Sequence, residues 1–119
     1  MELKNKRAIG TAYEERARAY LEAQGYQILE CNFHCKEGEI DIIAKDGEVL
    51  AFVEVKYRCN LQKGHPFEAV TITKQRRISR CARYYLYRHH LQEIPCRFDV
   101  VGILGEEILL QKNAFDYVE

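Results

Sequence analysis

The sequence predicts an α+β (α/β) fold in which a central mixed β-sheet is flanked by helices, in the order α-β-β-β-α-β-β. Two segments carry apolar residues at the three- and four-residue spacing of a helix. The other apolar runs are short and are separated by turn residues, as in strands. A length of 119 residues with 47% hydrophobic residues supports one globular domain over residues 1–119.

The first helix is expected to end at Gly25, a typical C-terminal stop. Its apolar stripe is formed by Ile9, Tyr13, Ala17, Tyr20 and Leu21. At about 100° per residue, Glu14 falls at the edge of this stripe and Glu15 falls in solvent. We therefore expect Glu14 to face the fold.

Three strands are expected next, over residues 26–33, 39–44 and 49–56. Asp46 and Gly47 lie between the last two strands and are typical of a two-residue hairpin turn. This turn would pair Lys45 with Glu48, so that Asp41 lies opposite Phe52 and Glu39 lies opposite Glu54. Both strands are apolar on both faces, which places the hairpin in the centre of the sheet.

Residues 59–71 are expected to form a loop, and Thr73 to about Leu91 a second helix. Its predicted buried face consists of Ile78, Cys81, Ala82, Tyr85 and Leu86. Residues 97–104 and 108–112 then form two closing strands.

Alternation along the predicted hairpin places Glu39, Asp41, Glu54 and Lys56 on one face. Asp41 and Glu54 become diagonal neighbours with Cα atoms roughly 7–8 Å apart, so both carboxylates can reach one cation. Mg²⁺ prefers such oxygen ligands, usually one or two carboxylates with water and phosphate. The alternative is a buried salt-bridge cluster in which Lys56 pairs with Glu54 or Glu39.

The formal net charge is zero, but the charges are segregated: residues 56–92 hold nine basic residues and one acid. On the second helix, Arg76, Arg80, Arg83 and Tyr87 fall within about 60° of one another. Basic side chains interleaved with tyrosines suit a phosphate backbone and stacked bases. The alternative is an ordinary solvated helix face, although such faces usually mix both signs of charge.

The chain shows neither an apolar signal segment nor an apolar run of roughly 20 residues, so we expect a cytoplasmic protein with no membrane partner. Five cysteines are an odd number and favour reduced thiols. Only Cys31, His34 and Cys35 are clustered, whereas a structural zinc site would need two such pairs.

The pattern Asp41-x12-Glu54-Val55-Lys56 resembles the PD-(D/E)XK nuclease superfamily. From about Arg7 to Ile103, the chain is similar to one branch of it, the YraN family of small bacterial proteins related to Holliday-junction resolvases. The similar segments are Gly38–Asp41, Phe52–Arg58, Gly64–Val70, Lys74, Ala82–Leu86 and Arg97–Val100. Two positions depart from the pattern: Ile40 replaces the proline of the superfamily's name, and Tyr13 stands where a glycine is common.

The resemblance implies a restriction-endonuclease-like core and a metal-dependent endonuclease that hydrolyses phosphodiester bonds in branched or single-stranded DNA. It implies Mg²⁺ or Mn²⁺ held by Asp41, Glu54 and the Val55 carbonyl, with Glu39 as a further ligand or a supporting acid. Lys56 would orient the attacking water, and Glu14 would complete the catalytic set. The expected nucleic-acid-binding residues are Arg58, Lys74, Arg76, Arg77, Arg80, Arg83 and Tyr87.

Two other functions fit the same residues. The first is a non-catalytic nucleic-acid-binding module that works with a helicase or repair enzyme. The second is a structural protein whose basic helix docks an acidic partner. A homodimer is also expected, because resolvase-like proteins that cut two strands act in pairs.

Overall fold

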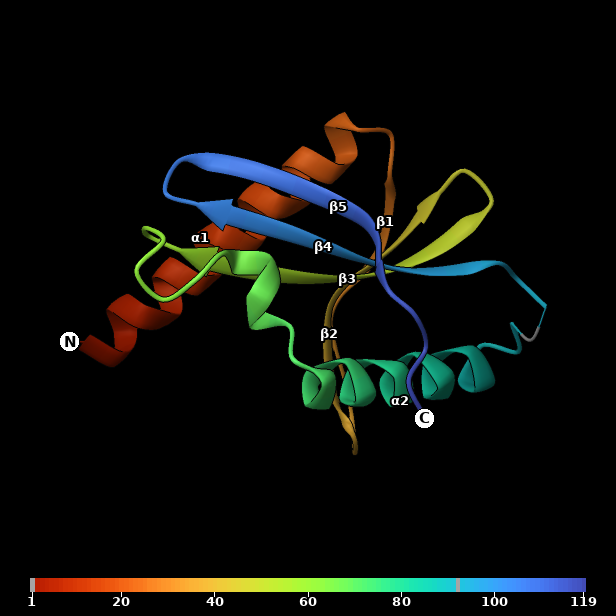
Figure 1. The fold of residues 1–119 in the computed structure, drawn as a ribbon. Helices are drawn as coiled ribbons and strands as arrows, with labels where there is room; N and C mark the ends of the chain where they lie inside the picture. The colour runs from red at the N-terminus through yellow and green to blue at the C-terminus, as the bar shows by residue number, and fades with distance from the viewer. Residues whose placement is uncertain (1, 92) are drawn as a thin grey trace.

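A computed structural model describes residues 2–91 and 93–119, with side chains described from Ala12 onward. The elements are α1 (Glu2–Ala23), β1 (Gln27–Cys35), β2 (Gly38–Asp46), β3 (Val49–Arg58), the 3-10 turn η1 (Pro66–Ala69), α2 (Ile72–Arg88), β4 (Cys96–Leu104) and β5 (Glu107–Phe115) (Figure 1). The predicted α+β fold and its element order are confirmed. Neither helix in the described residues has the length and apolar character needed to cross a membrane.

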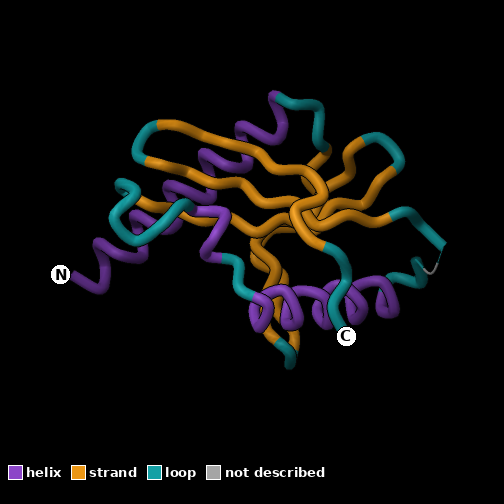
Figure 2. Tube along the Cα trace, in the orientation of Figure 1, coloured by secondary structure: helices purple, strands orange, loops and turns teal. Residues whose placement is uncertain are grey.

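One five-stranded sheet, in the order β1-β2-β3-β4-β5, forms the centre of the fold. Strands β3 and β4 are parallel, and all other neighbours are antiparallel. The parallel pair is connected by η1 and α2, which cross from the end of β3 to the start of β4 (Figure 2). The two long helices lie on opposite faces of the sheet (Figure 1).

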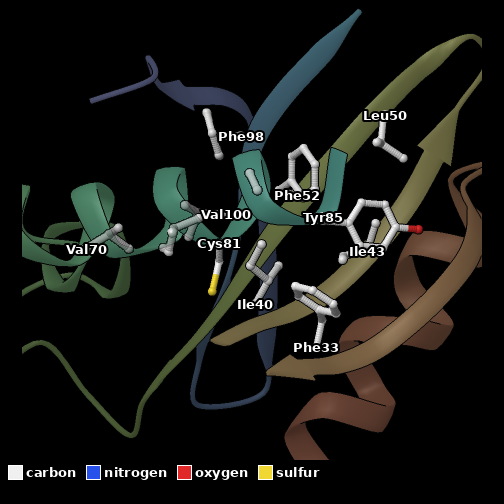
Figure 3. Close-up of a cluster of buried hydrophobic side chains, with 12 residues drawn as sticks. Phe33, Ile40, Ile43, Leu50, Phe52, Val70, Cys81, Tyr85, Phe98 and Val100 are labelled. Atoms are coloured by element: carbon white, nitrogen blue, oxygen red, sulfur yellow. The ribbon is translucent and has the colours of Figure 1, made fainter. Parts of the chain in front are cut away.

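Each helix buries one apolar face against the sheet. The core on the α2 side joins Ile78, Cys81, Ala82 and Tyr85 of the helix to sheet residues that include Phe33, Ile40, Phe52 and Phe98 (Figure 3). On the opposite side, Ala17 and Leu21 of α1 are fully buried. The predicted face of α2 is confirmed, with Leu86 only partly buried. On α1, Ala17 and Leu21 are buried and Tyr13 packs against them, whereas Tyr20 is half-buried outside this core and the side chain of Ile9 lies outside the described residues.

The central hairpin has a different register from the predicted one. Asp46 pairs with Val49, so the turn consists of Gly47 and Glu48, and Lys45 pairs with Leu50 instead of Glu48. Gly47 has φ 63°, as the first central residue of a type II′ turn requires. Asp46 stays in the strand because Arg97 Nη2 and Lys112 Nζ bind its Oδ2 at 2.7 and 2.9 Å.

This register changes the predicted cross-strand partners but keeps the residues of β3 on their predicted faces. Phe52 pairs with Ile43, so the predictions that Asp41 lies opposite Phe52 and Glu39 opposite Glu54 are wrong. Each paired residue of β2, from Ile42 to Asp46, meets a partner two positions further along β3 than expected. A shift of two positions preserves alternation, so Glu54 stays on its predicted side of β3.

The second helix is shorter than predicted and ends at Arg88 instead of Leu91. His89 caps it through a backbone N–H that donates to the Tyr85 carbonyl. His90 then adopts φ 56°, a left-handed conformation that helical residues do not adopt, so the chain turns towards β4.

Strands β1 and β2 change face at Asn32 and Asp41. Phe33 and Ile40 pack in the core on the α2 side, whereas Cys31 and Ile42 pack on the α1 side. Residues two apart in a regular strand share a face, so both strands must twist sharply between these positions. The tip of this hairpin thereby leaves the plane of the sheet and contacts α2, near which both strands end in Figure 1.

A network of buried polar side chains, centred on Asp99, links several strands of the sheet. Asp99 has 0% exposure and accepts hydrogen bonds from Tyr26 Oη (2.7 Å), Arg97 Nε (2.7 Å) and the Asn113 backbone N–H (2.9 Å). Arg97 also binds Asp46, so the network joins the start of β1 to β2, β4 and β5. These bonds to Asp99 raise the pKa of Arg97 above its usual value.

We expect Asp99→Ala to destabilise the fold by about 3–5 kcal/mol, because it leaves the Arg97 charge without its buried partner. The urea midpoint of unfolding measures this loss. Glu107→Ala is the matched control: Glu107 is exposed on β5, and its loss should change stability by less than about 0.5 kcal/mol. Equal effects of the two substitutions would contradict a structural role for the network.

Candidate functional site

A pocket of about 180 Å³ opens where β2 separates from β3. It is lined by Tyr13, Glu14, Glu39, Asp41, Glu54, Val55, Lys56, Tyr57 and Lys74. All four residues predicted to be catalytic, together with the expected ligands Val55 and Glu39, therefore lie around one pocket. Helix α1 supplies Tyr13 and Glu14, and α2 supplies Lys74, so both helices and two strands build the site.

Asp41 is held in the pocket by the backbone of β3. The last β2–β3 pair on this side is Ile42 with Val53, and beyond it Asp41 Oδ2 accepts the Val55 N–H at 2.8 Å. The carboxylate thus takes the place of a carbonyl at the point where the ladder stops. This bond fixes Asp41 beside the segment that carries Glu54 and Lys56.

Glu54 is a buried acid at the back of the pocket, with 3% exposure. Lys74 Nζ lies 3.3 Å from its Oε2, and Lys56 Nζ lies 4.0 Å away. Neither ammonium is aligned as a hydrogen-bond donor, because within the described residues Glu54 Oε2 has no hydrogen-bond partner. A buried carboxylate oxygen without a donor is unfavourable, so this atom is a candidate ligand.

Each acid of the pocket makes the ionisation of its neighbours less favourable. Burial, followed by the nearby Glu54 carboxyl, raises the pKa of Asp41 to about 8, although the Val55 N–H and Lys74 oppose this change. Burial also raises the pKa of Glu14, with smaller contributions from Asp41 and Glu39 and an opposing hydrogen bond from Asn32. A bound cation would reverse this penalty by favouring the ionised carboxylates.

The donor set fits a hard divalent cation held by few protein ligands. Within residues 2–91 and 93–119, no group of three or more His, Cys, Asp and Glu side chains is arranged to hold a metal. The pocket offers the Asp41 and Glu54 carboxylates and is lined by neither cysteine nor histidine. Mg²⁺ usually binds through one or two carboxylates and retains water, so the pair and the unpartnered Glu54 oxygen fit it.

Glu39 lies at the rim of the pocket. Its side chain is exposed, and its Oε2 is 3.4 Å from His34 Nδ1, an ion pair when the imidazole is protonated. Glu39 is thus positioned less deeply than Asp41 and Glu54. Of the two roles expected for it, a supporting acid fits this position better than a direct ligand.

The predicted nucleic-acid-binding residues fall into three groups. Lys74 faces the carboxylate pocket, and Arg58 lies at the end of β3, where its Nη1 donates to the Tyr57 carbonyl. The remaining residues of the set lie along α2: Arg76, Arg77, Arg80, Arg83 and Tyr87. Of these, Arg76 and Arg80 already have partners, whereas Arg83 and Tyr87 are exposed.

Three residues at the site were not among the predicted site residues: Tyr13 and Tyr57, which line the pocket, and Asn32, which lines a neighbouring hollow with Glu14 and Asp41. Tyr57 stacks on Tyr13 with ring centroids 3.7 Å apart and forms one wall. Asn32 has φ 54° and supports Glu14 from the twisted part of β1. Alternation from Val53 and Val55 could have placed Tyr57 on the α1 side, and asparagine is among the residues that tolerate positive φ.

A larger cavity, about 590 Å³, lies elsewhere, between α2, the sheet and the C-terminal segment. Its walls include Phe52, Leu86, Phe98 and Phe115, and its Arg97 is bound to Asp99 and Asp46. The smaller pocket is the candidate site because it holds the unpartnered buried carboxylate.

Together, the fold and the pocket define a small α+β protein in which a half-buried aspartate and a buried glutamate lie beside two lysines. Residues 13–103 match the model of "Uncharacterised protein family UPF0102", and the chain belongs to that family. The matched region contains every residue of the pocket.

Relatives from distant bacteria cover nearly the whole chain. A UPF0102 protein of Lachnoclostridium phytofermentans is 58% identical over 94% of this chain and 96% of its own length. A UPF0102 protein of Caldicellulosiruptor saccharolyticus is 48% identical over 93% of this chain and 99% of its own. One from Chromohalobacter salexigens is 46% identical over 94% of both chains.

The raised pKa of Asp41 predicts a pH-dependent stability. Between its ordinary pKa of 3.8 and its folded value of about 8, the folded state retains a proton that the unfolded state releases. Stability should therefore fall as pH rises through this interval. Asp41→Asn keeps an acceptor for the Val55 N–H but does not ionise. Its free energy of unfolding, relative to that of the wild type, should therefore increase by roughly 1–3 kcal/mol between pH 5 and pH 8.

Urea midpoints in EDTA at the two pH values measure this gain. The control is Asp116→Asn, an exposed aspartate beyond β5, whose effect should be small and independent of pH. A constant difference between Asp41→Asn and the wild type would show that Asp41 is ionised throughout.

Proposed function

We propose that this protein is a Mg²⁺- or Mn²⁺-dependent endonuclease that hydrolyses phosphodiester bonds in DNA. The observation that carries the proposal is the pair formed by the half-buried Asp41 and the buried Glu54, whose Oε2 has no hydrogen-bond partner within the described residues. Two lysines stand beside this pair, where a phosphate would need positive charge. The resemblance to PD-(D/E)XK nucleases supports the same conclusion.

Asp41, Glu54 and the Val55 carbonyl would hold the ion. When bound, the ion would supply Lewis-acid stabilisation of charge on the scissile phosphate. Lys56 would orient the attacking water and stabilise charge in the transition state. Lys74, whose Nζ lies 3.3 Å from Glu54 Oε2, would bind a phosphate oxygen. Glu14 faces the same pocket from α1 and would accept a hydrogen bond from that water.

The basic face of α2 would bind the nucleic-acid backbone outside the pocket. Arg83 and Tyr87 are exposed there, and Arg76 and Arg80 lie on the same helix. Lys74, in the first turn of α2, lies between this face and the carboxylates, with its Nζ beside Glu54. A cytoplasmic location, a homodimer and a helicase or repair partner accompany this proposal.

A second function is favoured by the same lysines. Lys74 and Lys56 approach Glu54 Oε2 at 3.3 and 4.0 Å, so they compensate part of its buried charge. A non-catalytic module that binds nucleic acid beside a partner enzyme would need only this ion-pair cluster. Metal dependence separates the two functions.

We expect Lys56→Ala to reduce cleavage on the order of 10²–10³-fold with little change in binding, because Lys56 would act on the reacting atoms. Linear, single-stranded, flap and four-way DNA substrates, incubated with Mg²⁺ or Mn²⁺, form the assay. Asp41→Ala is the blank, and Lys63→Ala, in the exposed loop after β3, is the matched lysine control.

Undiminished cleavage by Lys56→Ala would overturn the assigned mechanism. Metal-independent binding by the wild type, with no cleavage of any substrate, would instead support the non-catalytic module. RNA versions of the same substrates test whether the activity is restricted to DNA.

Arg83→Ala should weaken nucleic-acid binding and lower the slope of log K against log salt by about 0.7–0.9, the contribution of one phosphate contact. The expectation rests on the exposure of Arg83 on α2. Fluorescence anisotropy over a salt series measures the slope. Arg18→Ala, at an exposed arginine paired with Glu22 on α1, should leave it unchanged. If both variants show the same slope, the nucleic acid binds to a surface away from α2.

A further inference from the structure

Two cysteines from distant parts of the chain meet where the β1–β2 hairpin contacts α2. Cys35 Sγ, at the end of β1, lies 2.6 Å from Cys81 Sγ of α2. Non-bonded heavy atoms usually approach to roughly 3.5–4.0 Å, whereas bonded sulfurs lie about 2.05 Å apart. A small movement of either side chain would therefore bring the sulfurs to bonding distance.

We propose that Cys35 and Cys81 form a reversible dithiol–disulfide pair, a redox modification site that joins the β1–β2 hairpin to α2. The inference is independent of the proposed nuclease function. It rests on the distance between the two sulfurs and on the different surroundings of the two thiols.

Cys35 is suited to react first. Its side chain is partly exposed, and the Glu37 backbone N–H donates to its Sγ at 3.4 Å. Cys81 is fully buried in the core shown in Figure 3, and burial raises the pKa of its thiol to about 12. An oxidant would reach Cys35, and Cys81 would then resolve the oxidised sulfur from inside the protein.

With hydrogen peroxide as the oxidant, the steps balance. The Cys35 thiolate attacks one peroxide oxygen, the O–O bond breaks, and Cys35 becomes a sulfenic acid while hydroxide leaves. Cys81 Sγ then attacks the Cys35 sulfur, the S–O bond breaks, and the thiol proton leaves with that oxygen as water. Two thiols lose two electrons in total, and one peroxide yields two waters.

The other three cysteines lie elsewhere. Cys31 is only four residues from Cys35, but the twist at Asn32 places it in the core on the α1 side. Cys59 and Cys96 are exposed, one after β3 and one at the start of β4. They provide matched controls because their thiols are more accessible than either member of the pair.

The cross-link would add to contacts that already hold the hairpin against the helix. Arg80, the neighbour of Cys81, forms an ion pair with Glu37 at the hairpin tip, with 3.6 Å between Nη1 and Oε2. A disulfide that closes a loop between residues 46 apart should raise Tm on the order of 10 °C.

The test uses the full-length chain, reduced, desalted and exposed to a small excess of hydrogen peroxide. Remaining thiols are alkylated with N-ethylmaleimide, and the digest is analysed by mass spectrometry. We expect two of the five thiols to be protected, a linked Cys35–Cys81 peptide to appear, and dithiothreitol to reverse both changes. Tm should rise with the cross-link.

Cys59→Ser and Cys96→Ser should each retain the linked peptide, whereas Cys35→Ser should abolish both the peptide and the rise in Tm. Cys35→Ser is the decisive variant because its site is partly exposed and tolerates a polar replacement better than the buried Cys81. Full alkylation of all thiols after peroxide, cross-links spread over other cysteine pairs, or overoxidation of Cys35 without a cross-link would each overturn the proposal.

Discussion

The separation of β2 from β3 at Asp41 determines most of what is distinctive in this structure. The backbone ladder stops at Ile42, and the Asp41 side chain accepts the next β3 amide, Val55 N–H. The unpaired amide is thus satisfied without a strand beside it. This hydrogen bond holds the Asp41 carboxylate over the pocket at the point where the two strands separate. Beyond this point the hairpin tip turns towards α2. A second acid, Asp99, does the same for Asn113 N–H at the irregularity between β4 and β5.

The buried charges of the pocket explain why zero net charge is a poor guide to this protein. Four acids and two lysines line the pocket, so acids outnumber lysines there although the whole chain is neutral. Within the described residues Glu54 Oε2 has no hydrogen-bond donor, and the pKa of Asp41 is raised. A purely structural ion-pair cluster is expected to satisfy its members more completely. Incomplete satisfaction inside a pocket is more typical of a site that awaits a ligand.

Periodicity was sufficient to predict the elements, because both helices and the hairpin bury regular apolar faces. It also placed Glu14 correctly, since its angle on α1 depends only on helix geometry. The hairpin register was not predictable locally, because Asp46 is kept in the strand by Arg97 and Lys112 from distant strands. Glu54 and Lys56 keep their predicted face because a shift of two positions preserves alternation. Glu39 and Asp41 lie where β2 changes face, and they still line the same pocket. The twist at Asn32, and with it the meeting of Cys35 and Cys81, depends on tertiary packing.

The parallel pairing of β3 with β4 has a consequence for how the site assembles. The β2–β3 hairpin needs only local chain to form, whereas β4 can join it only after the crossover, residues 59–95, has closed. Closing a long loop is entropically slow compared with forming a hairpin. The acids at positions 41 and 54 are therefore brought together early in folding, and Lys74, carried by the crossover, arrives later. The pocket is therefore complete only when β4 has joined the sheet.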